Sequence, residues 1–193
     1  KSLPRHRFLH EEQVRDRIGG IRTEGLRSAA LYFDAQIPFA ERLVVEIAES
    51  AWSNGAKIAT RATVTALKAD GAVATGVRVR DELDGEPFVV TGRSIVNVAG
   101  PWVDQVIGRK PGSRNRERMI GGTKGSHIFV DRWPGAPSDA IYTESKRDAR
   151  PVLIIPWNGM IMLGSTDLRF DGDLDDVVAS DEEIRYLLDE ANA

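Results

Sequence analysis

Cysteine is absent from the 193-residue sequence, which excludes disulfides, thiolate metal sites and thiol catalysis. Its absence fits a reducing compartment, and we expect a cytoplasmic protein. No apolar run approaches the roughly 18 residues needed to cross a bilayer. Residues 1–20 are charged and lack the apolar segment of a signal peptide.

Two further absences limit the classes of ligand. The sequence has no G-x-G-x-x-G, the turn that holds a dinucleotide pyrophosphate. It has no excess of positive charge, because 26 Lys and Arg stand against 29 Asp and Glu, and we expect no nucleic-acid partner. The basic cluster at 109–118 is interrupted by Gly, Pro, Ser and Asn, which predicts a solvated loop. The aspartates at 171–176 lack the spacing and the bidentate Glu of a calcium loop, so we expect no metal site.

The rest of the composition is that of an ordinary globular protein. Apolar residues make up 41% and charged residues 28% of the chain, and its length suffices for one large domain or two small ones. The chain begins without Met and ends inside a helical pattern. We therefore expect it to be a piece of a longer chain.

The stretch at 94–108, SIVNVAGPWVDQVIG, organises the middle of the chain. It predicts a buried strand over 95–98 that breaks at Ala99 and Gly100 and enters a short helix. A strand that ends at small residues lets a ligand approach free backbone N–H groups. The alternative is a tight turn between strand and helix that serves no ligand.

The clearest helix is predicted over 40–54, where apolar residues recur at the helical period and Gly55 suits the C-terminal cap. A strand over 57–67 follows, so the two form half of an α/β crossover unit. Short alternating segments then predict a β-meander inserted before the strand at 95–98. We expect the strands at 57–67 and 95–98 to be neighbours in one sheet.

The second half predicts an antiparallel sheet, because its connections are too short for helical crossovers. The last helix opens with Ser180 and Glu183 as a capping box, and a first helix is predicted over 8–18. The fold class is therefore mixed: a partial α/β layer with an inserted β-meander, plus an antiparallel-sheet domain of the α+β kind. The strands of that domain are predicted at 29–37, 127–130, 140–143, 152–155 and 160–163.

The segment GGTKGSHIFV is the first candidate for chemistry. Lys124, Ser126 and His127 offer a cation, a hydroxyl and a base within four positions. A general base wants a pKa near neutrality, which histidine has without special tuning. A structural histidine at a strand start explains His127 equally well. The segment GSTD at 164–167 adds Ser165, which suits either a polyol or phosphate ligand or a polar turn.

Four motifs occur in order: ALYFDAQ at 30–36, VNVAGPWVD at 96–104, KGSHIFV at 124–130 and IPWNGMIMLGSTD at 155–167. Together they resemble the FAD-dependent glycerol-3-phosphate dehydrogenases, within the wider group of flavoproteins similar to D-amino-acid oxidase. The resemblance runs from about residue 25 to the end of the sequence.

The resemblance implies a role for each of these sites. His127 would face the flavin ring as the catalytic base. Lys124 would bind the substrate phosphate, and Ser165, where the family commonly has Thr, would face the substrate pocket. The implied cofactor-binding residues are Val64, Ala99, Gly100 and Trp102.

The implied reaction moves hydride from C2 of sn-glycerol 3-phosphate to N5 of the flavin, while a base takes the C2 hydroxyl proton. The product is dihydroxyacetone phosphate, and electrons pass on to quinone. Such enzymes associate peripherally with the inner face of the membrane, although no stretch of this sequence predicts an amphipathic anchor.

The resemblance also divides the chain. It implies a charged, partly helical leader at 1–24, a partial FAD-binding domain at 40–110, and a discontinuous substrate-binding domain at 25–39 and 116–193. The family's glycine-rich N-terminal unit and its C-terminal segment with phosphate-binding arginines are missing. We therefore expect this chain alone to bind FAD poorly and not to turn over.

Two alternatives stay open. The first is an amine or amino-acid oxidase of the same flavoprotein group. A phosphate ester needs a cationic anchor, for which Lys124 is the candidate, whereas the substrate of such an oxidase does not. A non-catalytic interaction module would show an exposed apolar patch, with His127 buried away from any pocket.

Overall fold

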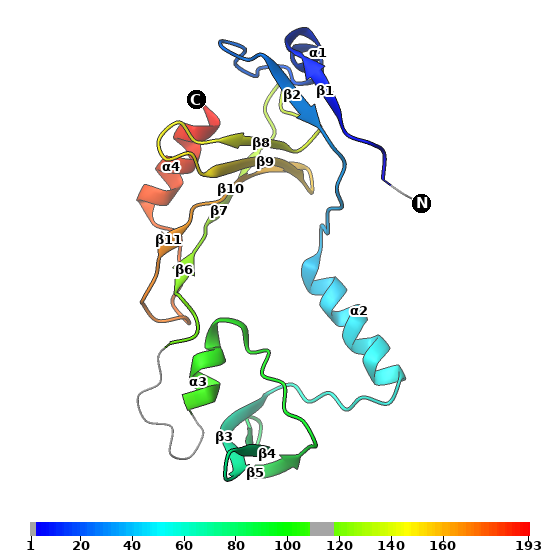
Figure 1. Ribbon diagram of the computed structural model, residues 1–193, viewed down its shortest axis with the longest axis vertical. Helices are drawn as coiled ribbons and strands as arrows, with labels where there is room; N and C mark the ends of the chain where they lie inside the picture. The colour runs from blue at the N-terminus through cyan, green and yellow to red at the C-terminus, as the bar shows by residue number, and fades with distance from the viewer. Residues whose placement is uncertain (1–2, 109–117) are drawn as a thin grey trace. The chain divides into compact units, whose positions relative to one another are not determined.

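The computed structural model describes residues 3–108 and 118–193 (Figure 1). By its contacts the chain divides into two compact units. The first comprises residues 1–43, 123–170 and 177–193, and the second comprises residues 44–122 and 171–176. The predicted division into a leader, a cofactor-binding domain and a substrate-binding domain assigns a function to each part. A division by contacts does not test those functions, so the predicted domains stay a prediction.

An antiparallel four-stranded sheet in the order β7–β10–β9–β8 forms the centre of the first unit. A two-residue turn joins β9 to β10, and its Asn158 and Gly159 have φ values of 47° and 85°, as a tight hairpin requires. The predicted antiparallel sheet is confirmed for its four later strands, whereas the early strand that was predicted to join it lies in a separate two-stranded sheet. Its strands are β7 (His127–Asp131), β8 (Ile141–Glu144), β9 (Pro151–Trp157) and β10 (Met160–Gly164).

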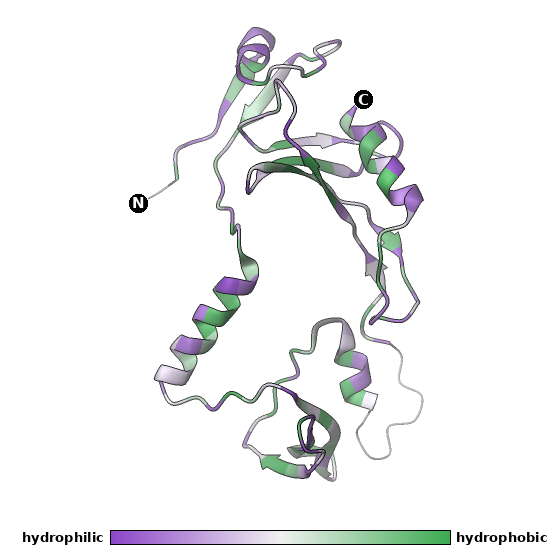
Figure 2. Cartoon of the chain, turned by 180° about the vertical axis from the view of Figure 1, so that it is seen from behind, coloured by the Kyte–Doolittle hydropathy of each residue, from purple (hydrophilic) through white to green (hydrophobic). Residues whose placement is uncertain are grey.

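One helix, α4 (Asp181–Ala191), packs against β7, β9 and β10 (Figure 1). The predicted capping box is present, because the Glu183 backbone N–H donates to Ser180 Oγ at 3.3 Å and the Glu183 carboxylate accepts from the Ser180 N–H at 2.9 Å. Hydrophobic residues concentrate in β9 and β10 (Figure 2). The apolar residues that are at most 2% exposed are Val14, Val152, Ile161, Leu163 and Leu187.

The remaining elements of the first unit are short. β6 (Thr123–Lys124) pairs with β11 (Leu168–Arg169). β1 (Arg7–His10) pairs antiparallel with β2 (Ser28–Leu31) and is followed by α1 (Glu11–Arg17).

These bounds correct two predictions near the N-terminus. The predicted helix over 8–18 loses its first turn to β1, because residues 8–10 form a ladder with β2. The strand predicted over 29–37 ends at Leu31, where its pairing with Arg7 ends.

The second unit contains a β-meander in the order β3–β4–β5, which includes the strand that was predicted to belong to the α/β layer as well as the two inserted strands. Its strands are β3 (Ala62–Asp70), β4 (Val73–Asp81) and β5 (Pro87–Thr91). A 3₁₀ turn, η1 (Gly100–Trp102), leads into α3 (Val103–Gly108), which packs against β3. The predicted short helix after Gly100 is confirmed.

The strand predicted over 95–98 is wrong as a buried strand. Residues 94–99 belong to no strand in the described chain, and the Val96 and Val98 side chains are 78% and 85% exposed. A strand needs a hydrogen-bonding neighbour, and β3, the neighbour expected for it, pairs instead with β4. That strand also begins at Ala62 rather than at residue 57, after Arg61 turns the chain with a φ of 54°.

The predicted helix over 40–54 is present as α2 (Ala40–Ser53), and Gly55 follows it with a φ of 91°. Its residues alternate between hydrophobic and hydrophilic along the helix (Figure 2). None of them is buried, and Val44, Ile47 and Trp52 are 65%, 60% and 70% exposed. The sequence therefore predicts the helix correctly, but the described chain covers no apolar face on it.

The predicted basic loop at 109–118 lies outside the described residues except for Arg118. That residue forms an ion pair with Asp171, with an N–O distance of 3.0 Å.

Candidate functional site

His127 opens β7 opposite Gly164, the last residue of β10. The histidine is exposed, whereas Gly164 is buried. A Cβ added to Gly164 would overlap the His127 ring. The imidazole therefore lies against the backbone at the point where the chain enters the Ser165 turn, and a side chain at position 164 would displace it.

Hydrogen bonds join the turn before His127 to the turn after Gly164. The backbone N–H of Ser126 donates to Thr166 Oγ1 at 2.8 Å, and the backbone N–H of Thr166 donates to the Ser126 carbonyl at 3.2 Å. The Arg150 guanidinium donates to the Asp167 carbonyl. The two segments that the sequence singles out, GSH and GSTD, therefore form one structural group in the first unit.

Glu183 lies beneath this group, and no functional role was predicted for it. Its side chain is 2% exposed. The hydroxyls of Thr166 and Ser126 donate to its Oε1 at 2.7 and 2.8 Å. Burial raises the pKa of Glu183, but hydrogen bonds from Lys124, the Ser180 N–H, Thr166 and Ser126 outweigh it and lower the pKa to about 2. The carboxylate is therefore ionised at neutral pH.

Lys124 neutralises this carboxylate. Its Nζ lies 2.7 Å from Glu183 Oε2 and donates to the Val178 carbonyl at 2.8 Å. It also lies 5.9 Å from the centre of the Phe170 ring, within the range of a cation–π interaction. An ammonium has three donors, so two contacts leave Lys124 one N–H for a ligand.

Asn97 organises the turn in the second unit. Its side-chain amide donates to the Val103 carbonyl at 3.2 Å, and its Oδ1 accepts from the Ala99 N–H at 3.2 Å. Gly100 has a φ of 53°, a value that favours glycine, and Trp102 is 40% exposed. Ala99, Gly100 and Trp102 therefore form one tight turn, as predicted.

Val64 lies in the same unit but not in that turn. It pairs with Val79 in the ladder between β3 and β4, beside an irregularity in the register. α3 rests on the same strand.

Asp104 ties α3 to the residues that lead out of the second unit. Its two carboxylate oxygens accept from the backbone N–H groups of Met119 and Ile120 at 3.0 and 3.1 Å. These two hydrogen bonds lower the pKa of Asp104 below its usual value.

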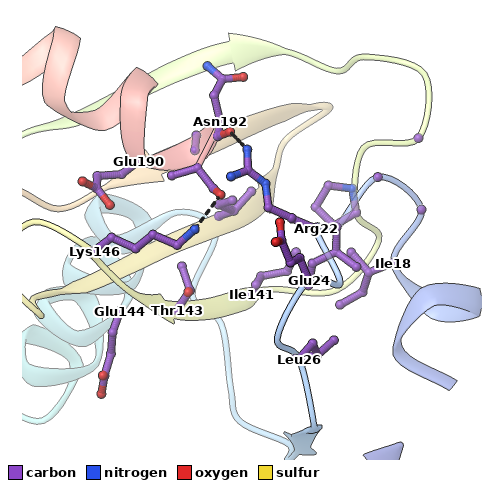
Figure 3. Close-up of a pocket in the computed structure, with 18 of the residues that line it drawn as sticks. Ile18, Arg22, Glu24, Leu26, Ile141, Thr143, Glu144, Lys146, Glu190 and Asn192 are labelled. Atoms are coloured by element: carbon purple, nitrogen blue, oxygen red, sulfur yellow. Dashed lines mark hydrogen bonds between the residues drawn. The ribbon is translucent and has the colours of Figure 1, made fainter. Parts of the chain in front are cut away.

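A cavity of about 550 Å³ lies elsewhere in the first unit (Figure 3). Its charged lining residues are Arg22, Glu24, Glu144, Lys146 and Glu190. Arg22 and Lys146 donate to the backbone carbonyls of Asn192 and Ala193. None of His127, Lys124 and Ser165 lines it. The cavity is therefore separate from the group around His127.

The group around His127 combines an exposed imidazole with hydroxyls held in fixed directions. An imidazole can accept a proton from an alcohol, and a neighbouring hydroxyl can orient that alcohol. Among the described residues no three His, Asp or Glu side chains gather to hold a metal ion. The chemistry that this group offers is proton transfer and hydrogen bonding.

Comparison with known proteins gives the chemical context. The family described as FAD dependent oxidoreductase (DAO) matches residues 1–193. This chain belongs to that family. FAD is the cofactor by which the family is defined, so the cofactor class predicted from the four motifs is confirmed.

Relatives narrow the resemblance further. A glycerol-3-phosphate dehydrogenase of Synechocystis is 44% identical over 200 residues, covering 100% of this chain and 36% of the relative. An aerobic glycerol-3-phosphate dehydrogenase of Staphylococcus haemolyticus is 29% identical over 193 residues. The alignment covers 100% of this chain and 34% of that relative. The resemblance to glycerol-3-phosphate dehydrogenases is confirmed. The chain spans about a third of the length of these relatives.

A solved structure agrees. The glycerol-3-phosphate dehydrogenase of Bacillus halodurans, complexed with FAD, superimposes with a TM-score of 0.79 at 28% identity over 96% of this chain and 37% of that one. The mixed fold class is confirmed. No helix in residues 3–108 and 118–193 has the length and apolar character needed to cross a membrane.

Proposed function

We propose that this chain contributes to an FAD-dependent dehydrogenase that oxidises sn-glycerol 3-phosphate to dihydroxyacetone phosphate. Three observations support the proposal: the family, the names of the relatives, and the group around His127. The last carries it, because an exposed imidazole beside a hydroxyl-bearing turn suits the oxidation of an alcohol. A histidine buried away from solvent would have favoured a non-catalytic module.

The second unit offers part of a site for FAD. Val96 and Val98 present exposed apolar side chains, and Gly100 leaves the backbone open at the turn. Such a surface suits the flat rings of a dinucleotide. The pyrophosphate has no matching glycine-rich turn in this sequence. The residues proposed to contact the cofactor are Val64, Ala99, Gly100 and Trp102.

His127 acts as the general base. FAD held by Val64, Ala99, Gly100 and Trp102 would supply the acceptor for the hydride of the substrate C2. A ring nitrogen of His127 takes the proton of the C2 hydroxyl, so that the carbon loses one hydride and the oxygen loses one proton to give a ketone. A positioned base contributes about 10²- to 10⁴-fold to such a step.

Ser165 and Lys124 bind the substrate. Ser165 directly follows Gly164, the cross-strand partner of His127, and its hydroxyl would bind the substrate. Lys124 has one ammonium N–H beyond its two contacts in the protein, so it adds one hydrogen bond to a phosphate. A doubly charged phosphate needs further cations, which the family's C-terminal arginines supply.

The chain by itself binds FAD poorly and does not turn over. It lacks a pyrophosphate-binding turn, it spans about a third of its relatives, and the apolar residues of α2 are exposed. In the complete enzyme electrons pass to a quinone, and the enzyme associates peripherally with the inner face of the membrane.

The test uses the full-length protein that contains this chain, purified with FAD. Under anaerobic conditions sn-glycerol 3-phosphate should bleach the oxidised flavin absorbance and yield dihydroxyacetone phosphate, and a quinone analogue should restore the absorbance. Bleaching by an amine or an amino acid, with none by sn-glycerol 3-phosphate, would establish the alternative oxidase instead.

A further inference from the structure

Glu183 is a buried carboxylate, and each of its two oxygens accepts two hydrogen bonds. Oε1 accepts from Thr166 and Ser126, and Oε2 accepts from the Ser180 N–H and from Lys124. Removing a carboxylate from water is costly unless it is paired and hydrogen-bonded. The chain meets that condition with four donors from three separate segments.

Helix capping does not explain this arrangement. α1 has the same type of capping box, in which the His10 N–H donates to Gln13 Oε1 at 3.0 Å. Gln13 is neutral and exposed. A capping box therefore needs neither a charge nor burial, and the contacts of Glu183 with Thr166 and Ser126 must serve another purpose.

Each hydroxyl that Glu183 binds lies next to a proposed active-site residue. Ser126 precedes His127, and Thr166 follows Ser165. Because Thr166 Oγ1 donates to Glu183, its lone pairs point toward the Ser126 N–H, which donates back to it at 2.8 Å. The carboxylate thus sets the direction of a hydrogen bond that joins the two turns.

The packing between the turns leaves little room for error. A Cβ added to Gly125 would lie 2.7 Å from the Thr166 carbonyl oxygen, and one added to Gly164 would overlap the His127 ring. A small shift of either turn would therefore move the imidazole relative to Ser165.

We propose that Glu183 is a positioning residue, which holds His127 and Ser165 in a reactive arrangement through Ser126 and Thr166. This inference rests on the proposed function for the role of His127, but the geometry it describes can be tested without it. Lys124 acts in the same unit as the counter-ion of the carboxylate.

The first test is NMR on this chain, which has three histidines. Glu183→Gln should move or broaden the imidazole Cε1–H signal of His127 and leave those of His6 and His10 in place. Glu182→Gln is the matched control, since Glu182 is exposed on the same helical turn, and it should move none. Signals of His127 identical in wild type and Glu183→Gln would overturn the proposal.

The second test is the turnover of the full-length protein loaded with FAD. Glu183→Gln should lower kcat about 10- to 100-fold with KM little changed, because misplacement of a base slows the chemical step more than binding. Thr166→Val should act in the same direction, and Thr166→Ser, which keeps the hydroxyl, should restore kcat. A rise in KM with kcat unchanged would contradict the positioning role, and so would equal kcat values for Thr166→Val and Thr166→Ser.

A double variant separates this inference from the proposed function. If His127→Asn lowers kcat, then adding Glu183→Gln to it should lower kcat little further. An undiminished additional loss would show that Glu183 acts independently of His127. If His127→Asn leaves kcat unchanged, the proposed function of His127 fails, while the NMR test still decides whether Glu183 positions the ring.

Discussion

Gly164 shows how much a single residue decides at this site. Its hydrogen occupies the space where any side chain would meet the His127 ring. It also ends β10 and begins the turn that carries Ser165. The identity of the residue at 164 is therefore set by its cross-strand neighbour.

Gly164→Ala should displace the His127 ring, because the added Cβ would overlap it, and it should change the free energy of unfolding little, because this ring is exposed and can rotate away. Urea unfolding and the His127 NMR signal would measure the two effects. Gly19→Ala is the control, because a Cβ there meets nothing within 4 Å and the backbone is not in the left-handed region. A His127 signal that is identical in Gly164→Ala and wild type would contradict the overlap.

Glu183 makes stability depend on pH. Folding lowers its pKa from 4.5 to about 2, so its contribution is fully present above pH 4.5 and is lost as the pH falls toward 2. The contribution is at most about 3 kcal/mol. The free energy of unfolding of wild type should therefore fall more steeply than that of Glu183→Gln between these pH values. Parallel curves would show that the carboxylate titrates alike in both states.

The sequence predicts some of these residues and not others. His127, Lys124 and Ser165 stand in recognisable motifs, so they could be proposed without a structure. Glu183 could be predicted as a capping residue, because that depends on a spacing of three. Its bond to Ser126 spans 57 residues, and no local pattern reports a contact over that separation.

At the scale of the elements, Asp104 fixes the join between α3 and the residues that follow position 118. It accepts two backbone hydrogen bonds with two oxygens, which charge strengthens. An amide at this position can accept with only one of its two polar atoms.

Asp104→Asn should therefore free one of these N–H groups. Hydrogen exchange at Met119 or Ile120 should become faster, with exchange in β4 unchanged. Asp70→Asn, at the exposed end of β3, should change neither. Unaltered exchange at both Met119 and Ile120 would contradict the role of the carboxylate.

Elements whose partners lie nearby in the sequence were predictable. The hairpins and the β-meander pair neighbours along the chain, so alternation and turn residues suffice to find them. The segment at 95–98 has the composition of a buried strand, yet nothing in the described chain pairs with it. A strand that depends on a distant partner cannot be judged from its own residues.

At the scale of the whole molecule, the described chain leaves many large apolar side chains exposed to solvent. The apolar residues of α2 are exposed, as are Val96 and Val98. Large exposed apolar surfaces are typical of sites that contact other protein surface or ligands. The exposed apolar surface agrees with the finding that the chain spans about a third of the length of its relatives.

The chain alone should therefore purify without a stoichiometric flavin. Its absorbance in the flavin bands, after incubation with FAD and removal of free cofactor, should stay far below one FAD per chain. The full-length protein treated in the same way is the control and should retain its cofactor. A yellow chain with one FAD each would show that these 193 residues suffice for binding.

The most direct test of the account is the turnover of His127→Asn in the full-length protein, with His10→Asn as the control. We predict that His127→Asn lowers kcat with sn-glycerol 3-phosphate about 10²- to 10⁴-fold while the bound flavin keeps its absorbance, and that His10→Asn matches wild type. A His127→Asn enzyme that turns over within about twofold of wild type, with the same dependence on pH, would contradict the assignment of His127 as the base.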